Sequence, residues 1–194
     1  MLPDRPLFPL QTVLLPGGVL PLRIFETRYI DMVRECLRES QGLVVVALRA
    51  GSEVQQAVNF ADLGTYAEII DWEQRPEGLL GIVVQGRQRV RIQAPRQQTD
   101  GLWRGDLVPL EEWPDIEVPV AYASMVDLLQ RLLRQLGSPW SDIPQRLQDA
   151  AWVAGRLTEL MPLEIDLKQE ILESDDPLER LTRLRAAMLA LANP

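Results

Sequence analysis

The sequence predicts an α+β protein: a small β-barrel or strongly curved antiparallel sheet with one inserted helix, followed by a four-helix subdomain. Two observations support this prediction. Up to about residue 110, short apolar runs rich in β-branched residues alternate with Gly and Pro turn signals. After residue 113, apolar residues recur at the spacing of helices. We therefore expect a β-rich subdomain over residues 1–113 and a helical bundle over residues 114–194.

Within the first part we expect extended segments that end at turn residues. Residues 13–15 and 19–25 are predicted to be joined by a Pro-Gly turn at Pro16 and Gly17. Further strands are expected at residues 42–48, 64–72, 79–84 and 87–92, and Asp100-Gly101 is typical of a hairpin turn.

One helix is predicted to interrupt the strands, over residues 26–40. Its apolar stripe includes Tyr29, Cys36 and Leu37. No basic group is placed to lower the pKa of the Cys36 thiol, so we interpret this cysteine as a buried core residue and not as a nucleophile.

Four helices are expected in the second part. Helical periodicity covers residues 119–136, 144–161, 167–173 and 177–191. Asp176, Pro177 and Glu179 form a strong helix-start signal, with Asp176 as the N-cap. Leu37 in the first part and Leu191 in the last helix are both predicted to face inward. Trp113 and Trp140 lie in connectors, where they could anchor the two parts together or lie at a partner surface; we expect anchoring, because a buried indole dominates a small interface.

The composition excludes several classes of chemistry. The chain of 194 residues has no His, a single Cys and a single Lys, Lys168. Catalytic arrangements that use His, and zinc sites of His and Cys, therefore cannot be built. No glycine-rich phosphate loop is present. Adjacent carboxylates at Glu111-Glu112 and Asp175-Asp176 are better explained as a charged connector and a helix cap. We therefore predict a non-enzymatic protein without cofactor or metal.

The charge distribution and the first residues constrain partners and location. The net charge is −8, and residues 111–194, with 8 basic and 15 acidic side chains, account for most of it. Such an excess disfavours broad binding to nucleic acid or to anionic membranes. Prolines interrupt both the first ten residues and the apolar stretch that follows, so neither an export signal nor a membrane span is expected. We therefore expect a cytoplasmic protein.

Two groups of residues are candidate binding sites. Leu22, Arg23, Phe25 and Tyr29 belong to the apolar, proline-rich segment near the start, whose edges can receive an extended peptide by strand addition or simply fill the core. Arg87, Arg89 and Arg91 alternate with apolar residues, so they are expected to share one face of a strand. That face could read a carboxylate or phosphate, or it could be a solvated face balanced by acids.

The same segments resemble a known family. The runs are Leu7-Phe8-Pro9-Leu10, Pro16-Gly17-Gly18 and Leu20-Pro21-Leu22-Arg23-Ile24-Phe25-Glu26, followed by Arg28-Tyr29, and later Gly86-Arg87-Gln88-Arg89-Val90-Arg91-Ile92. Together with the helical tail near Lys168-Gln169-Glu170 and Glu179-Arg180-Leu181, they resemble the Lon protease N-terminal domain, and most closely its stand-alone members. The resemblance covers nearly the whole chain.

This resemblance implies a PUA-like β-barrel followed by a helical bundle, and a role in holding polypeptides. It carries over neither ATP hydrolysis nor proteolysis, because no ATPase or peptidase motif is present. We therefore expect a module that binds polypeptide or protein partners, such as unfolded substrates or a separately encoded ATPase or protease. The alternatives are an RNA-binding PUA-like protein, although nucleic acid is disfavoured, and a hydrolase with an unusual carboxylate site.

Overall fold

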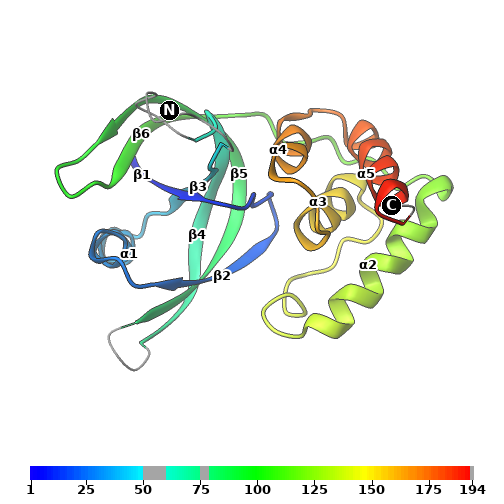
Figure 1. The fold of residues 1–194 in the computed structure, drawn as a ribbon, viewed down its shortest axis with the longest axis horizontal. Coiled ribbons are helices and arrows are strands. Elements are labelled where there is room, and N and C mark those ends of the chain that lie inside the picture. Colours follow the sequence, from blue (N-terminus) through cyan, green and yellow to red (C-terminus); the bar gives the residue numbers. More distant parts are fainter. Residues whose placement is uncertain (50–59, 75–78, 193–194) are drawn as a thin grey trace.

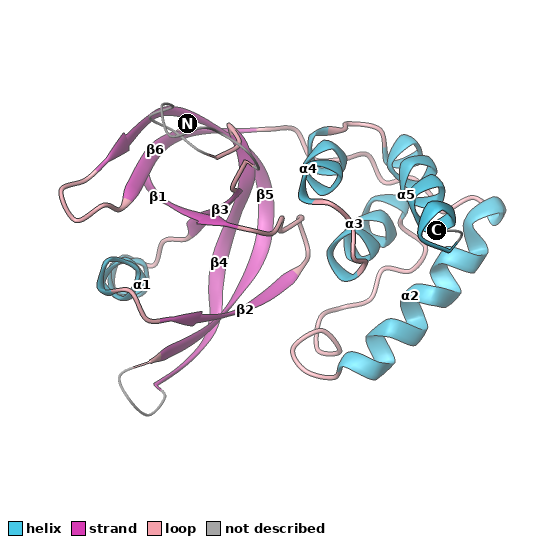
Figure 2. Cartoon of the chain, in the orientation of Figure 1, coloured by secondary structure: helices cyan, strands magenta, loops and turns pink. Residues whose placement is uncertain are grey.

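The computed structural model describes residues 1–49, 60–74 and 79–192, which form a strand-rich half and a helical half (Figure 1). The strands are β1 (Leu2–Leu10), β2 (Val19–Ile24), β3 (Leu43–Ala47), β4 (Leu63–Gln74), β5 (Leu80–Gln97) and β6 (Trp103–Pro109). Helix α1 (Thr27–Glu39) lies between β2 and β3 in the chain. The second half holds η2 (Val120–Tyr122), α2 (Ala123–Leu136), α3 (Ala150–Leu160), α4 (Ile165–Glu173) and α5 (Pro177–Ala192). The α+β class and the four C-terminal helices are confirmed (Figure 2).

The six strands form one mixed sheet that closes on itself. Their order is β2-β5-β4-β3-β1-β6, and β5 also pairs with β6. Hydrogen bonding therefore makes a ring of five strands, to which β2 is attached through β5. The expectation of an antiparallel sheet is wrong at one pair, because β1 and β3 run parallel. The chain between them passes through β2 and α1, which supplies the long crossover that a parallel pair requires.

The first strand lies earlier in the chain than predicted. Residues 13–15 are buried but belong to no strand, and β1 is Leu2–Leu10 despite its three prolines. Proline is tolerated in a strand where its missing N–H would point away from the neighbouring strand. The predicted turn is confirmed: Gly17 has a φ of 81° and the Gly18 N–H donates to the Leu15 carbonyl at 3.0 Å.

The strands expected at residues 79–84 and 87–92 are one strand, and Gly86 between them does not end it. Gly86 lies inside β5, which continues for 18 residues. A Cβ on Gly86 would lie 2.6 Å from the Leu15 carbonyl oxygen. Glycine is therefore required here because the segment before β2 crosses β5 closely.

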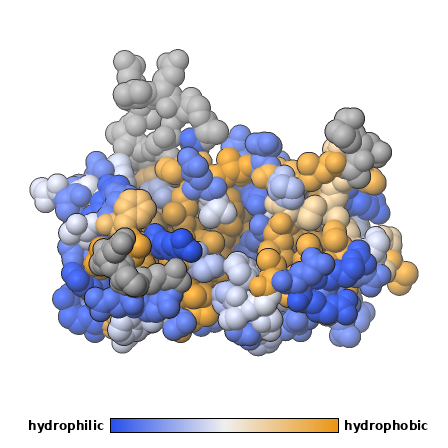
Figure 3. All heavy atoms as spheres, turned by 60° about the horizontal axis from the view of Figure 1, so that its bottom comes forward, coloured by the Kyte–Doolittle hydropathy of each residue, from blue (hydrophilic) through white to orange (hydrophobic). Residues whose placement is uncertain are grey.

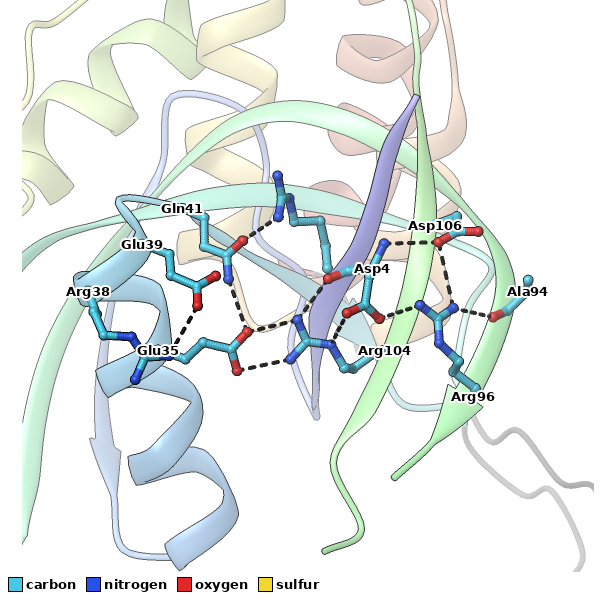
Figure 4. Close-up of polar contacts among 10 residues, drawn as sticks. Asp4, Glu35, Arg38, Glu39, Gln41, Ala94, Arg96, Arg104 and Asp106 are labelled. Carbon is cyan, nitrogen blue, oxygen red and sulfur yellow. Dashed lines mark hydrogen bonds and ion pairs between the residues drawn. The ribbon is translucent and has the colours of Figure 1, made fainter. Parts of the chain in front are cut away.

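Helix α1 packs one face on the sheet, and polar contacts flank that face. Met32, Val33 and Cys36 are buried, whereas Leu37 is 39% exposed, so the predicted stripe is one residue too wide. Figure 4 shows Glu35 of α1 facing Arg104 of β6. The Arg104 guanidinium, 5% exposed, donates to both carboxylate oxygens of Glu35 at 2.8 and 3.0 Å.

The contacts of Arg104 continue into a chain of ion pairs across β1, β6 and β5. Asp4 pairs with Arg104 and Arg96, and Arg96 also pairs with Asp106 (Figure 4). Burial opposes the charge of Arg104, but its hydrogen bonds and ion pairs with Glu35 and Asp4 outweigh burial and raise its pKa. These contacts fix α1 to the sheet beside its apolar face.

Two helix predictions need correction. Helix α3 begins at Ala150 and not at Pro144, because the Asp149 side chain caps it by accepting from the N–H groups of Ala151 and Trp152. In α5, Leu191 is 48% exposed and does not face inward as predicted. The N-cap of α5 is confirmed by the bond of the Leu178 N–H to Asp176, at 2.8 Å.

The two halves share one hydrophobic cluster. Leu15 and Leu63 of the strand-rich half pack in the same cluster as Leu129, Leu157 and Leu181 of the helical half. A second cluster fills the space between α1 and the sheet. The helical half is therefore packed directly onto the outside of the strand ring.

Candidate functional site

The four residues predicted to bind polypeptide border a single cavity of about 460 Å³. Its walls are the end of β1, the end of β2 and the start of α1, and we call it the β1–β2 cavity. It is lined by Phe8, Pro9, Leu10, Leu22, Arg23, Ile24, Phe25, Glu26, Arg28, Tyr29, Leu48 and Trp103. The lining is mostly apolar, as is typical of binding pockets.

Phe25 is the most exposed aromatic side chain on this rim. It is 71% exposed, at the junction between β2 and α1. Figure 3, which brings the lower side of Figure 1 forward, shows apolar residues reaching the surface between hydrophilic stretches. A large exposed apolar side chain beside an apolar cavity is typical of an interaction site.

Tyr29 forms the floor of the cavity near the start of α1. Its ring packs on Phe8 with centroids 4.4 Å apart, and the Arg28 guanidinium lies 4.7 Å from its centroid. Burial raises the pKa of Tyr29. Arg28 also pairs with Glu26 at 2.7 Å and donates to the Gly101 carbonyl at 3.0 Å. These contacts hold the first turn of α1 in place beside the cavity.

A second hollow of about 260 Å³ also borders β2. We call it the outer groove; it is formed by β2 and the ends of β4 and β5 next to their connection. Trp72, which is 55% exposed, lines it. Leu22 and Arg23 line both hollows, so β2 forms the ridge between them.

The three alternating arginines do not form a free basic face. Arg87 is bonded to Glu68 at 2.8 Å, and Arg91 is bonded to Asp62 at 3.0 Å, both at the surface. Arg89 between them is only 4% exposed. The register between β4 and β5 shifts at Arg87, which interrupts the regular alternation that predicted one shared face, and the helical half covers Arg89.

Arg89 links β5 to the end of α4. Its guanidinium donates to the backbone carbonyl groups of Leu172 and Glu111 at 3.2 and 3.3 Å, and to the Asp175 carboxylate at 2.8 Å. The last carbonyl groups of a helix lack partners within the helix, so a cation there is stabilising. Arg89 is therefore a structural link between the two halves.

Trp113 is the interdomain anchor that its position in a connector predicted. Its indole N–H donates to the Ser174 carbonyl at 3.1 Å. The guanidinium groups of Arg180 and Arg89 lie 3.3 and 4.5 Å from its ring centroid. Trp140 packs against the shared hydrophobic cluster.

Sequence reasoning did not find a buried ion pair that holds the segment before β2. Arg156 of α3 is 1% exposed and bonds Glu159 at 2.8 Å and the Pro16 carbonyl at 3.2 Å. Glu159 in turn accepts from the Leu15 N–H at 2.7 Å. The spacing of three residues predicts that Arg156 and Glu159 are neighbours on a helix, but no local pattern indicates their partners 140 residues away.

The described residues contain no group of three or more His, Cys, Asp or Glu side chains that could hold a metal ion. Burial raises the pKa of the Cys36 thiol to about 12, in keeping with a core residue. In the same part of the chain, no helix combines the length and the apolar character needed to cross a membrane.

The chain combines a closed ring of strands, an attached helical half and an apolar cavity at one strand edge. Residues 4–189 match the family model of the "ATP-dependent protease La (LON) substrate-binding domain". The chain belongs to this family.

Solved structures and curated sequences agree with this assignment. The Lon N-terminal domain protein of Xanthomonas campestris is 34% identical, with a TM-score of 0.76 over 94% of this chain and 97% of that one. The N-terminal domain of a Mycobacterium avium complex Lon protease shares the fold, with 23% identity and a TM-score of 0.61 over 93% of this chain and 95% of that one.

The Lon protease of Escherichia coli K12 is 28% identical over 95% of this chain, and that of Erwinia amylovora is 25% identical over 95%. The matched region is 24% of the length of each of these two proteases. The family model that matches residues 4–189 describes the substrate-binding domain of Lon proteases. That domain includes neither an ATPase nor a peptidase module.

Proposed function

We propose that this chain binds polypeptides that expose apolar segments, and that the β1–β2 cavity is the binding site. The observation that carries the proposal is Phe25, exposed on the rim of an apolar cavity in a member of a substrate-binding family. We also take the strand ring to be a PUA-like barrel. Partners that consume the bound polypeptide, such as a separately encoded ATPase or protease, belong to the same proposal.

The charges on β5 favour polypeptide over RNA as the ligand. Arg87 and Arg91 are each paired with a carboxylate, and Arg89 is buried against the helical half. Contacts with phosphates need accessible cations, and single-stranded RNA also needs aromatic platforms beside them. An apolar cavity with exposed aromatic residues fits non-native protein segments better.

The test is a titration with a labelled, reduced and carboxymethylated protein that cannot refold, followed by fluorescence anisotropy. We expect saturable binding, and we expect Phe25→Asp to weaken it by about tenfold or more, because a Phe side chain contributes roughly 1.5–3 kcal/mol when it is buried. The matched control is Val120→Asp, which adds the same charge at a residue 91% exposed in the helical half.

Two results would contradict the proposal. One is the absence of saturable binding by the unaltered chain, and the other is equal weakening by Phe25→Asp and Val120→Asp. The second result would mean that added negative charge, and not the cavity rim, controls the interaction.

A further inference from the structure

Strand β2 has one unpaired edge within the described sheet. It is the terminal strand in the order of the sheet and pairs only with β5, residue for residue from Val19 opposite Gln85 to Ile24 opposite Leu80. A strand edge of this kind presents backbone N–H and C=O groups that another strand can bind.

The direction of these backbone groups follows from a bond just before β2. The Gly86 N–H donates to the Gly18 carbonyl at 2.9 Å. In an antiparallel ladder every second residue bonds the partner strand, so Leu20, Leu22 and Ile24 face β5. The backbone groups of the intervening residues, Val19, Pro21 and Arg23, therefore point to the free edge.

Pro21 interrupts this edge without closing it. Proline has no N–H, and Val19 is 4% exposed because it packs in the cluster shared with the helical half. The accessible part of the edge therefore offers the N–H of Arg23 and the carbonyl groups of Pro21 and Arg23. A proline on an edge strand protects against uncontrolled pairing between sheets. This edge is therefore a restricted acceptor for one short added strand.

The space beside the edge suits an extended chain. Leu22 and Arg23 border both the β1–β2 cavity and the outer groove. Leu22, Ile82 and Trp72 are paired across β2, β5 and β4, so their side chains share one face of the sheet. Every second side chain of a strand added to β2 would lie on this face, beside Leu22.

The opposite wall of the cavity is also incompletely paired. The ladder between β1 and β6 ends at Leu7, so the last three residues of β1 pair only with β3 among the described strands. These residues, Phe8, Pro9 and Leu10, line the cavity. An added strand would lie between two apolar walls that already have strand geometry.

We propose that a polypeptide partner binds as an extended segment that adds to β2 as a further strand, through backbone hydrogen bonds to Pro21 and Arg23. This inference rests on the proposed function and specifies its geometry. The recognised feature is an extended backbone with alternating apolar side chains, and it excludes helical segments and segments with proline at the bonded positions.

The test compares two substitutions at Arg23 that both remove its charge. The probe is a labelled six-residue peptide, the length of β2, that alternates leucine or phenylalanine with threonine. Arg23→Pro removes the outward N–H, whereas Arg23→Ala keeps it. We expect Arg23→Pro to bind the probe about tenfold more weakly than Arg23→Ala, and Pro21→Ala, which adds an N–H, to bind about threefold more tightly than the unaltered chain.

A second arm uses the unaltered protein and stays informative if Arg23→Pro fails to fold. Two versions of the probe carry backbone N-methyl groups at alternate residues, one at the odd-numbered and the other at the even-numbered residues. Strand addition predicts that one of these versions no longer binds and that the other still binds. Strand addition would be overturned if the two N-methylated probes bound equally well and if Arg23→Pro and Arg23→Ala bound the probe with the same affinity. Polypeptide binding itself would not be contradicted by that result.

Two other results would also overturn this inference. If neither the probe nor the unfolded protein binds the unaltered chain, the proposed function fails together with it. If sedimentation shows a dimer that Arg23→Pro dissociates and Arg23→Ala does not, the edge of β2 is occupied by a second copy and not by a foreign segment.

Discussion

Two regions of this molecule depart in opposite ways from the usual rule that apolar side chains are buried and charged side chains are exposed. Between the two halves lies a seam of buried and half-buried side chains, most of them charged: Arg89, Trp113, Arg156, Glu159 and Arg180. Arg156 and Arg180 in it are 1% and 0% exposed. At the β1–β2 cavity and the outer groove, Phe25 and Trp72 are 71% and 55% exposed.

The two regions differ in where their partners are. Arg89, Arg156 and Glu159 find hydrogen-bond partners within the chain, on elements of the other half. Phe25 and Trp72 border hollows with no comparable cover among the described residues. Buried polar groups and exposed large apolar groups are both informative exceptions. Here the seam accounts for the packing of the two halves, whereas the cavity rim indicates a ligand from outside.

The largest effect should come from breaking the ion pair in the seam. Arg156→Met leaves the Glu159 carboxylate and the Pro16 carbonyl without their guanidinium, and removing one member of a buried pair costs about 3–5 kcal/mol. We expect the free energy of unfolding in urea to fall by about 3 kcal/mol.

The matched control for this pair is Arg183→Met. Arg183 also bonds two carboxylates, Glu170 and Glu179, but it is 41% exposed. Exposed pairs contribute little, so we expect a loss below about 1 kcal/mol. Similar losses for the two variants would mean that burial does not distinguish the seam from the surface.

The second prediction separates two arginines that face the same indole. Arg89 has acceptors on two segments, whereas none of the guanidinium nitrogens of Arg180 has a hydrogen-bond partner among the described residues. Burial and then the charge of Arg89 lower the pKa of Arg180 to about 9, so it is charged at neutral pH. A buried charge without an acceptor is unfavourable.

We therefore expect opposite effects from the same substitution in urea unfolding at pH 7. Arg89→Met should lower the free energy of unfolding by about 2–3 kcal/mol, because it leaves carbonyl groups at the end of α4 unsatisfied. Arg180→Met should raise it by about 1 kcal/mol. A loss with Arg180→Met as large as with Arg89→Met would show that stacking on Trp113 outweighs hydrogen bonding in the seam.

Periodicity and turn chemistry predicted the elements well where the signal is local. The start of α5 followed from Asp176 and Pro177, and the turn before β2 followed from Pro16 and Gly17. The first strand was missed because its prolines look like breakers, and whether each missing N–H points away from a neighbour depends on pairing that is not local. The parallel pairing of β1 with β3 is a consequence of topology and has no local signature.

The residues of the candidate site could likewise be predicted only where the sequence signal is local. Leu22, Arg23, Phe25 and Tyr29 were selected as one apolar segment, and the structure gathers them around one cavity because they are consecutive in β2 and α1. That they bind polypeptide remains a prediction, as does the division of the chain after residue 113. Arg89 looked the same as Arg87 and Arg91, because the helices that bury it are contributed by residues about 85 positions later.

The smallest effect concerns Cys36 in α1, the helix that borders the cavity. Burial raises the pKa of its thiol from 9.0 to about 12, so above pH 9 the unfolded chain loses this proton before the folded chain does. Stability from this group is therefore complete below pH 9 and is lost as the pH rises toward 12, by up to about 1.4 kcal/mol per pH unit. Cys36→Ala removes this dependence, and the measurement is the difference between the two chains in urea unfolding at pH 8 and pH 10. A difference that does not change with pH would mean that the folded thiol ionises as readily as a free one, and that α1 is not closely packed behind the cavity.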